Sequence, residues 1–197
     1  MTTVTITTIN EKSQTDPAGS YLGMTIAIAS WSMMFATLFI CYFVLRGRQI
    51  MWPPMGLRRL PLFLPIVNTC VLFTSSYLLR IGIMKFTTGT GTTCKRYLLM
   101  AITTGFLFLV LQILLWGQVS DSGIHLNTGA FGAVFYMMTW FHALHIVGGL
   151  TALIYITSRI ARGLTPEEGL LRARLIAIFW HFLVIVWVAI FLLIFVI

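Results

Sequence analysis

The chain has 197 residues, of which 58% are hydrophobic and only 9% are charged. Soluble domains contain roughly 45 to 50% apolar and about 25% charged residues, so this composition excludes a soluble fold. The formal net charge is +8, but the 13 lysines and arginines are scattered over the ends of apolar stretches instead of lying on one face. This distribution argues against binding to nucleic acid.

Five apolar stretches are each long enough to cross the ~30 Å hydrocarbon core of a bilayer as a helix. They predict an all-α polytopic membrane protein, a bundle of five transmembrane helices that forms a single domain over residues 21–197. The expected helices cover about 21–45, 61–84, 97–116, 131–157 and 175–197.

The segments between and before these stretches are short and polar. Residues 1–20 lack the basic and apolar regions of a cleavable signal and are expected to form a polar tail. Before the last stretch, Thr165 as an N-cap and Pro166 in the first helical position predict a short helical lead into the span.

Basic residues predict the orientation of the chain in the membrane. The tail with the second and fourth connections holds nine lysines and arginines: Lys12, Arg80, Lys85, Lys95, Arg96, Arg159, Arg162, Arg172 and Arg174. The first and third connections hold four: Arg46, Arg48, Arg58 and Arg59. The positive-inside rule then predicts a cytoplasmic N-terminus and an exterior C-terminus.

Acidic residues are missing from all five expected spans. The five acids, which all lie in the tail or the connections, are Glu11, Asp16, Asp121, Glu167 and Glu168. A pump or carrier usually has ionisable residues within its spans. An autonomous proton or sodium transporter is therefore disfavoured.

The polar residues inside the spans follow helical spacing. In the fourth span, Thr139, His142, His145, Gly149 and Ala152 share one face, which we expect to meet protein instead of lipid. Gly149 and the preceding glycine are expected to let a neighbouring helix approach closely.

The second and third spans carry further polar residues. Asn68 and Ser75 are seven residues apart, as are Thr69 and Ser76, and Gln112 lies in the third span. These side chains are expected to form hydrogen bonds between helices. The serines stand outside a G-x-S-x-G motif, which argues against an intramembrane peptidase.

The three intramembrane histidines are interpreted as neutral, hydrogen-bonded packing residues. The alternative is a haem-anchoring cytochrome b-type subunit in which His142 or His145 faces His181. The three cysteines lack the spacing of a zinc or iron–sulfur site and are interpreted as small apolar fillers. No catalytic, cofactor-binding or metal-binding residue is assigned.

Four motifs resemble subunit III of haem-copper terminal oxidases. Residues 135–149, FYMMTWFHALHIVGG, resemble the family's F-Y-x-L-T-G-x-H-G-x-H-V-x-x-G, and residues 179–187, FWHFLVIVW, resemble Y-W-H-F-V-D-V-V-W. Residues 22–24, LGM, resemble the start of L-G-M-W-L-F-L-x-S-E, and residues 68–76, NTCVLFTSS, resemble N-T-x-x-L-x-x-S-S. The resemblance covers the chain from residue 21 onward and matches the five-helix form of the family.

Three positions depart from the family pattern. Trp31 stands where the family has a glutamate, Val184 where it has an aspartate, and Trp140 where it has a glycine. Roles tied to the two intramembrane acids are therefore not transferred to this chain.

The resemblance implies a non-redox subunit of a respiratory oxidase in a bacterial inner membrane. Such a subunit packs against catalytic subunit I, in a complex with subunit II, stabilises it, supports its proton uptake and holds phospholipid. Haem and copper are then expected in the partner subunits and none in this chain. The accessory subunit of nitric oxide reductases, also five-helical, is the alternative within the family. The candidates for interface, lipid or structural roles are Trp31, Asn68, Ser75, His142, His145, Gly149, Trp180, His181 and Trp187.

Overall fold

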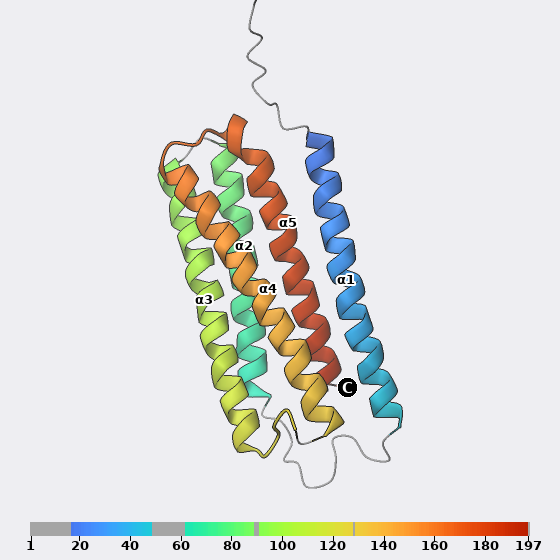
Figure 1. The fold of residues 1–197 in the computed structure, drawn as a ribbon. Helices are drawn as coiled ribbons and strands as arrows, with labels where there is room; N and C mark the ends of the chain where they lie inside the picture. The colour runs from blue at the N-terminus through green and yellow to red at the C-terminus, as the bar shows by residue number, and fades with distance from the viewer. Residues whose placement is uncertain (1–16, 49–61, 89–90, 128, 197) are drawn as a thin grey trace, which may run out of the picture.

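Five long helices form the molecule in the computed structural model, which describes residues 17–48, 62–88, 91–127 and 129–196. They are α1 (Pro17–Gly47), α2 (Phe63–Thr87), α3 (Gly91–Asp121), α4 (Ala130–Ala161) and α5 (Pro166–Phe191), and a π-helical turn, Leu192–Val196, follows α5. All five are long and apolar enough to cross a membrane (Figure 1). The prediction of an all-α bundle with five transmembrane helices is confirmed.

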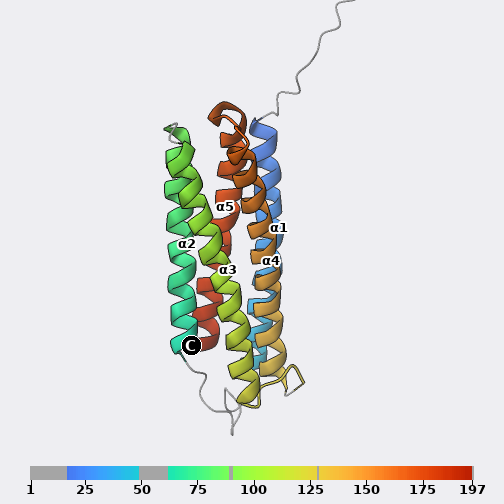
Figure 2. The same ribbon diagram turned by 90° about the vertical axis from the view of Figure 1, so that its left-hand side faces the viewer.

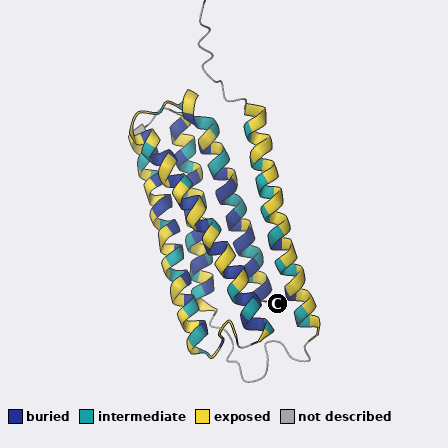
Figure 3. Ribbon diagram, in the orientation of Figure 1, coloured by how far each residue is buried: buried dark blue, intermediate teal, exposed yellow. Residues whose placement is uncertain are grey.

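The helices stand side by side and alternate in direction (Figures 1 and 2). The helix α5 packs against α1, α2 and α4, whereas α1 packs mainly on α4 and α5. Of the residues of α1, only Phe35 and Tyr42 are buried, so most of this helix faces outward (Figure 3). Of the five helices, α1 therefore has the smallest share of buried residues to hold it in the bundle.

Bulky side chains fill the space between the helices. The largest fully buried ones are Trp180, Trp187, Tyr42, Phe35, Phe108 and Phe135. They come from α1, α3, α4 and α5, so a single core runs along the bundle. Close packing matters here because lipid tails give helices no hydrophobic reason to associate.

Several helix boundaries differ from the predicted ones. The helix α1 begins at Pro17, so residues 17–20 belong to a helix instead of the expected tail. The helix α3 is longer than predicted at both ends, and α5 runs without a break from Pro166, whose N-cap is Thr165. Apolar length marks the part of a helix inside the hydrocarbon core, whereas the polar turns beyond it are helical too. The rest of the tail, 1–16, and most of the first connection, 49–61, lie outside the described residues.

Candidate functional site

One polar face of α2 contacts α3. The Nδ2 group of Asn68 donates a hydrogen bond of 3.0 Å to Oε1 of Gln112. The hydroxyl of Ser75, two turns along α2, donates to the backbone carbonyl of Ala101 at 2.8 Å. Asn68 and Ser75 are both fully buried. The seven-residue spacing therefore marks the side of α2 that meets α3.

The adjacent face of α2 contacts α5. The indole Nε1 of Trp187 donates to the hydroxyl of Thr69 at 3.0 Å. The hydroxyl of Ser76 and Nδ1 of His181 are 2.6 Å apart. The two seven-residue repeats of α2 thus join it to two different neighbours.

The helices α3 and α4 are joined in the same way. Nε1 of Trp116 donates to the hydroxyl of Thr139 at 3.0 Å, and that hydroxyl donates to the carbonyl of Phe135 in its own helix. Thr139 is the first residue of the polar and small stripe expected on α4. Its side chain lies inside the bundle, with 0% exposure.

His142 lies in a cage of aromatic rings. Its ring is fully buried, with centroids 5.4 Å from Trp187, 5.8 Å from Phe108 and 6.4 Å from Phe35. Neither ring nitrogen has a hydrogen-bond partner among the described residues. The expectation of a hydrogen-bonded packing histidine is wrong in this respect, because aromatic rings occupy the positions around the imidazole.

His145 faces α1. Its Nδ1 donates to the carbonyl of Phe141 at 2.6 Å, and its ring lies edge-on to Trp31 with centroids 5.6 Å apart. Trp31 also contacts Phe179 of α5, with centroids 4.8 Å apart. The indole of Trp31 therefore joins α1 to both α4 and α5.

Gly149 lies against Trp180 of α5, a residue of the motif at 179–187. A Cβ atom at Gly149 would stand 2.9 Å from the ring of Trp180, which is fully buried. At Gly148 a Cβ atom would meet nothing within 4 Å. The expectation that both glycines serve a helix contact therefore holds for Gly149 and is wrong for Gly148, whose side of α4 faces outward.

The three histidines have separate surroundings. His142 lies among rings, His145 contacts α1 and its own helix, and His181 contacts α2. In the described parts of the chain, no group of three or more His, Cys, Asp and Glu residues could hold a metal ion. Cys94 is buried, whereas Cys41 and Cys70 lie exposed on the outside of the bundle.

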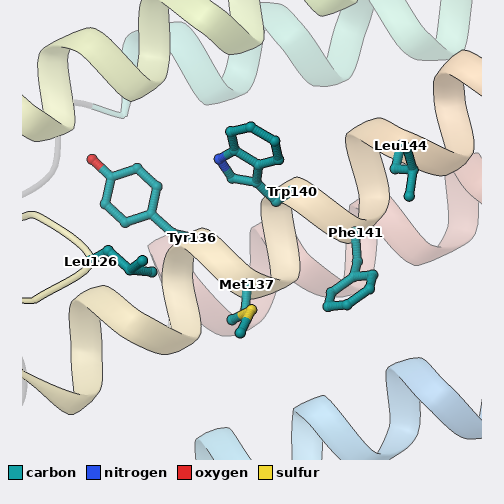
Figure 4. Close-up of a pocket in the computed structure, with 6 residues that line it drawn as sticks. All are labelled: Leu126, Tyr136, Met137, Trp140, Phe141 and Leu144. Carbon is teal, nitrogen blue, oxygen red and sulfur yellow. The ribbon is translucent and has the colours of Figure 1, made fainter.

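A broad apolar hollow lies on the outer side of α4 (Figure 4). Its volume is about 460 Å³. It is lined by Leu126, Tyr136, Met137, Trp140, Phe141 and Leu144. Trp140 stacks on Trp116 of α3 with the ring planes 10° apart, which fixes one wall. Sequence analysis did not single out this surface, although the aromatic residues at 136, 140 and 141 were a signal.

Comparisons with known proteins agree with this arrangement of helices and motifs. The profile of the family described as cytochrome c oxidase subunit III matches residues 5–197. The probable cytochrome c oxidase subunit 3 of Mycobacterium leprae is 31% identical over 172 residues, which make up 86% of this chain and 84% of that protein. The cytochrome c oxidase subunit 3 of Thermostichus vulcanus is 30% identical over 176 residues, or 89% and 86% of the two chains.

A third relative, the probable cytochrome c oxidase subunit 3 of Nocardia farcinica, is 32% identical over 86% of this chain and 84% of its own. The residues that the family profile matches, 5–197, include all five helices and all four sequence motifs. The resemblance seen in the sequence is confirmed, and the chain belongs to the cytochrome c oxidase subunit III family, the subunits III of haem-copper oxidases.

Proposed function

We propose that this chain acts as a non-redox subunit that packs against the catalytic subunit of a respiratory oxidase and stabilises it. The observation that carries the proposal is the contrast between the inside and the outside of the bundle. Inside, the polar side chains of α2 are engaged by α3 and α5. Outside, α1 and α4 present wide apolar surfaces, including the hollow beside Trp140.

The interior supports a structural role. Hydrogen bonds between helices fix their relative rotation, and close contacts such as that of Gly149 with Trp180 fix their distance. A bundle that is held in this way can offer a constant surface to a partner. The apolar hollow on α4 is a suitable place for side chains of a partner helix. Side chains that fill the hollow gain packing contacts that flexible lipid tails make poorly.

We also propose that this position beside the catalytic subunit supports proton uptake, in a bacterial inner membrane. A subunit that covers one side of the catalytic subunit holds the lipids and helices around the cytoplasmic entrance for protons in fixed positions. Of the ten described basic residues, eight lie at the end of the bundle where α1 begins: Arg80, Lys85, Lys95, Arg96, Arg159, Arg162, Arg172 and Arg174. The positive-inside rule supports a cytoplasmic position for this end.

Affinity purification of the tagged chain from its native membrane tests the proposal. We expect the catalytic subunit and subunit II to be recovered with it, as shown by peptide identification and by the haem spectrum of the complex. After separation from its partners, the chain should show no haem absorption in a reduced-minus-oxidised spectrum. Recovery of nitric oxide reductase subunits, or a haem spectrum in the separated chain, would contradict the proposal.

A further inference from the structure

Three apolar hollows follow one another along the outer side of α3 and α4, and together they form what we call the α3–α4 seam. The first, of about 460 Å³, is the hollow beside Trp140 (Figure 4). The second, of about 250 Å³, shares Trp140 and Leu144 with the first and reaches Val147. The third, of about 300 Å³, lies between Leu99 of α3 and Ile154 of α4.

The seam is as long as a membrane is thick. On α4 its lining residues extend from Tyr136 to Ala161, which is about 37 Å at ~1.5 Å per residue. The hydrocarbon core of a bilayer is ~30 Å thick, so the acyl chain of a phospholipid, which stays within one leaflet, covers only about half of the seam. A transmembrane helix covers all of it.

Trp140 forms a fixed ridge between the first two hollows. Its side chain is 60% exposed and lines both of them. Its ring stacks on that of Trp116, with centroids 5.2 Å apart, and Nε1 of Trp116 donates to the hydroxyl of Thr139. A fixed ridge suits a partner that is itself rigid, because two preformed surfaces lose little conformational freedom on contact. A helix meets this requirement better than an acyl chain does.

Two buried polar groups of the seam have no partner within the described parts of the chain. Gln112 lines the second hollow, and its Oε1 accepts a hydrogen bond from Asn68 while its Nε2 has no acceptor. Thr157 lines the third hollow, and its hydroxyl has no partner either. Lipid tails offer no hydrogen bonds, whereas polar side chains bind transmembrane helices to one another. The seam therefore suits a helix with polar side chains at these two levels.

The end of the seam at the third hollow carries a positive charge. Lys95 lines this hollow, and its ammonium group donates a hydrogen bond of 3.4 Å to the carbonyl of Ala161. No carboxylate of the described residues forms an ion pair with it. A partner with an acidic residue at this end is therefore complementary in charge.

We propose that one transmembrane helix of the catalytic subunit lies along the α3–α4 seam, with polar side chains opposite Gln112 and Thr157 and an acidic residue beside Lys95. The assignment rests on the proposed function, because that function supplies the catalytic subunit as the partner. The hollow beside Trp140 is one end of this seam. The face of the chain that meets the partner is thereby defined, together with the residues that fix the register of the two surfaces.

Photo-crosslinking in the native membrane is the test. The photoreactive amino acid p-benzoylphenylalanine replaces either Ile113, 62% exposed at the second hollow, or Leu99, 55% exposed at the third. After irradiation the complex is purified and the crosslinked peptides are identified by mass spectrometry. We expect both positions to crosslink to one helix of the catalytic subunit. Because parallel or antiparallel helices rise equally per residue, the two crosslinked residues on that helix should be about 14 residues apart, as the two positions are on α3.

The control places the same photoreactive amino acid at Tyr77, which is 65% exposed on α2 and lies outside the seam. It should not crosslink to that helix. Crosslinks from the seam to lipid alone, to a second copy of this chain or to a different subunit would overturn the proposal. Equal crosslinking to that helix from Tyr77 would overturn it too.

Two leucine variants test the polar contact at the second hollow. Both Asn68→Leu and Gln112→Leu remove the hydrogen bond between α2 and α3, but only Gln112→Leu also removes Nε2 of the glutamine. We expect Gln112→Leu to bind the catalytic subunit about 3- to 18-fold more weakly than Asn68→Leu, as measured by retention of that subunit after dilution in detergent. Equal retention in the two variants would contradict a contact through Nε2 and overturn the proposal.

The charge at the third hollow is tested in the same assay. K95Q should weaken retention of the catalytic subunit about 1.4- to 5-fold, the range for an ion pair that is partly exposed to solvent. R96Q is the matched control, since it removes the same charge from the next residue, which is exposed and outside the seam. The same loss in R96Q would indicate a general effect of charge and would overturn the proposal.

Failure of this inference is distinguishable from failure of the proposed function. If the catalytic subunit is recovered with the chain but the seam crosslinks elsewhere, the proposed function stands and the seam is not the contact. If the tagged chain is recovered without an oxidase catalytic subunit, the proposed function fails, and the seam loses its partner with it.

Discussion

Gly149 sets the distance between α4 and α5. A leucine at this position would overlap the ring of Trp180, because even its Cβ would lie 2.9 Å from a ring carbon. Overpacking of this kind typically costs about 1 to 3 kcal/mol. We expect Gly149→Leu to lower the thermal stability of the purified complex and to reduce recovery of the partner subunits.

The neighbouring Gly148 provides the matched control, because a Cβ atom there meets nothing within 4 Å. Gly148→Leu adds the same side chain on the outward side of α4 and should leave the thermal stability close to that of the unmodified complex. If Gly149→Leu behaves like this control, the contact between α4 and Trp180 does not hold the helices together.

The hydrogen bond between Asn68 and Gln112 is a second contact whose strength can be measured. Hydrogen bonds between transmembrane helices contribute about 0.6 kcal/mol on average and up to about 1.7 kcal/mol. In a double-mutant cycle with Asn68→Leu and Gln112→Leu, we expect a coupling energy of about 0.6 to 1.7 kcal/mol in the free energy of unfolding. A coupling energy near zero would show that the two amides do not depend on each other.

Periodicity predicted which residues of α2 face inward but not which residues they meet. The spacing of Asn68 with Ser75 and of Thr69 with Ser76 defines two sides of a helix. Their partners depend on the rotation and order of the other helices, which a single helical pattern does not contain. The ring cage of His142 is a similar case, because Phe35 and Phe108 come from helices that are distant in sequence.

At the scale of the helix, α1 needs specific contacts because few of its side chains are buried. The hydroxyl of Tyr42 donates a hydrogen bond of 2.6 Å to the carbonyl of Leu193, in the π-helical turn that follows α5. Carbonyls in the last turn of a helix lack partners within the helix. This bond therefore satisfies the end of one helix while it holds another in place.

Removal of the hydroxyl in Tyr42→Phe should destabilise the complex by about 1 kcal/mol. We also expect faster hydrogen exchange in α1 and in the turn Leu192–Val196. Tyr77→Phe is the control, since Tyr77 is 65% exposed on α2 and should tolerate the change. Unchanged exchange in Tyr42→Phe would indicate that packing around Phe35 holds α1 without this bond.

Hydropathy predicted the number of helices better than their ends. An apolar run measures the part of a helix that lies in hydrocarbon, whereas the first turns of α3 and α5 are polar and still helical. At Thr165 and Pro166 a specific start signal was available, and there the sequence located the beginning of the helix. Elsewhere the ends depended on backbone hydrogen bonds that composition does not show.

At the scale of the whole molecule, the basic residues divide unequally between the two ends of the bundle. Among the described residues, Arg46 and Arg48 lie where α1 ends, and the other eight lysines and arginines lie where α1 begins. Translocation is least favourable for connections that carry many basic residues. The five spans therefore place the end of α5 on the exterior side if α1 begins in the cytoplasm.

A reporter that is active only in the cytoplasm distinguishes the two orientations. Fused after residue 197, it should be silent, because α5 ends at the bundle end that carries Arg46 and Arg48. Inserted at Gly163, in the short connection between α4 and α5, it should be active. The two fusions control for each other's expression, since both leave α1 to α4 unchanged. Activity after residue 197 together with silence at Gly163 would reverse the orientation.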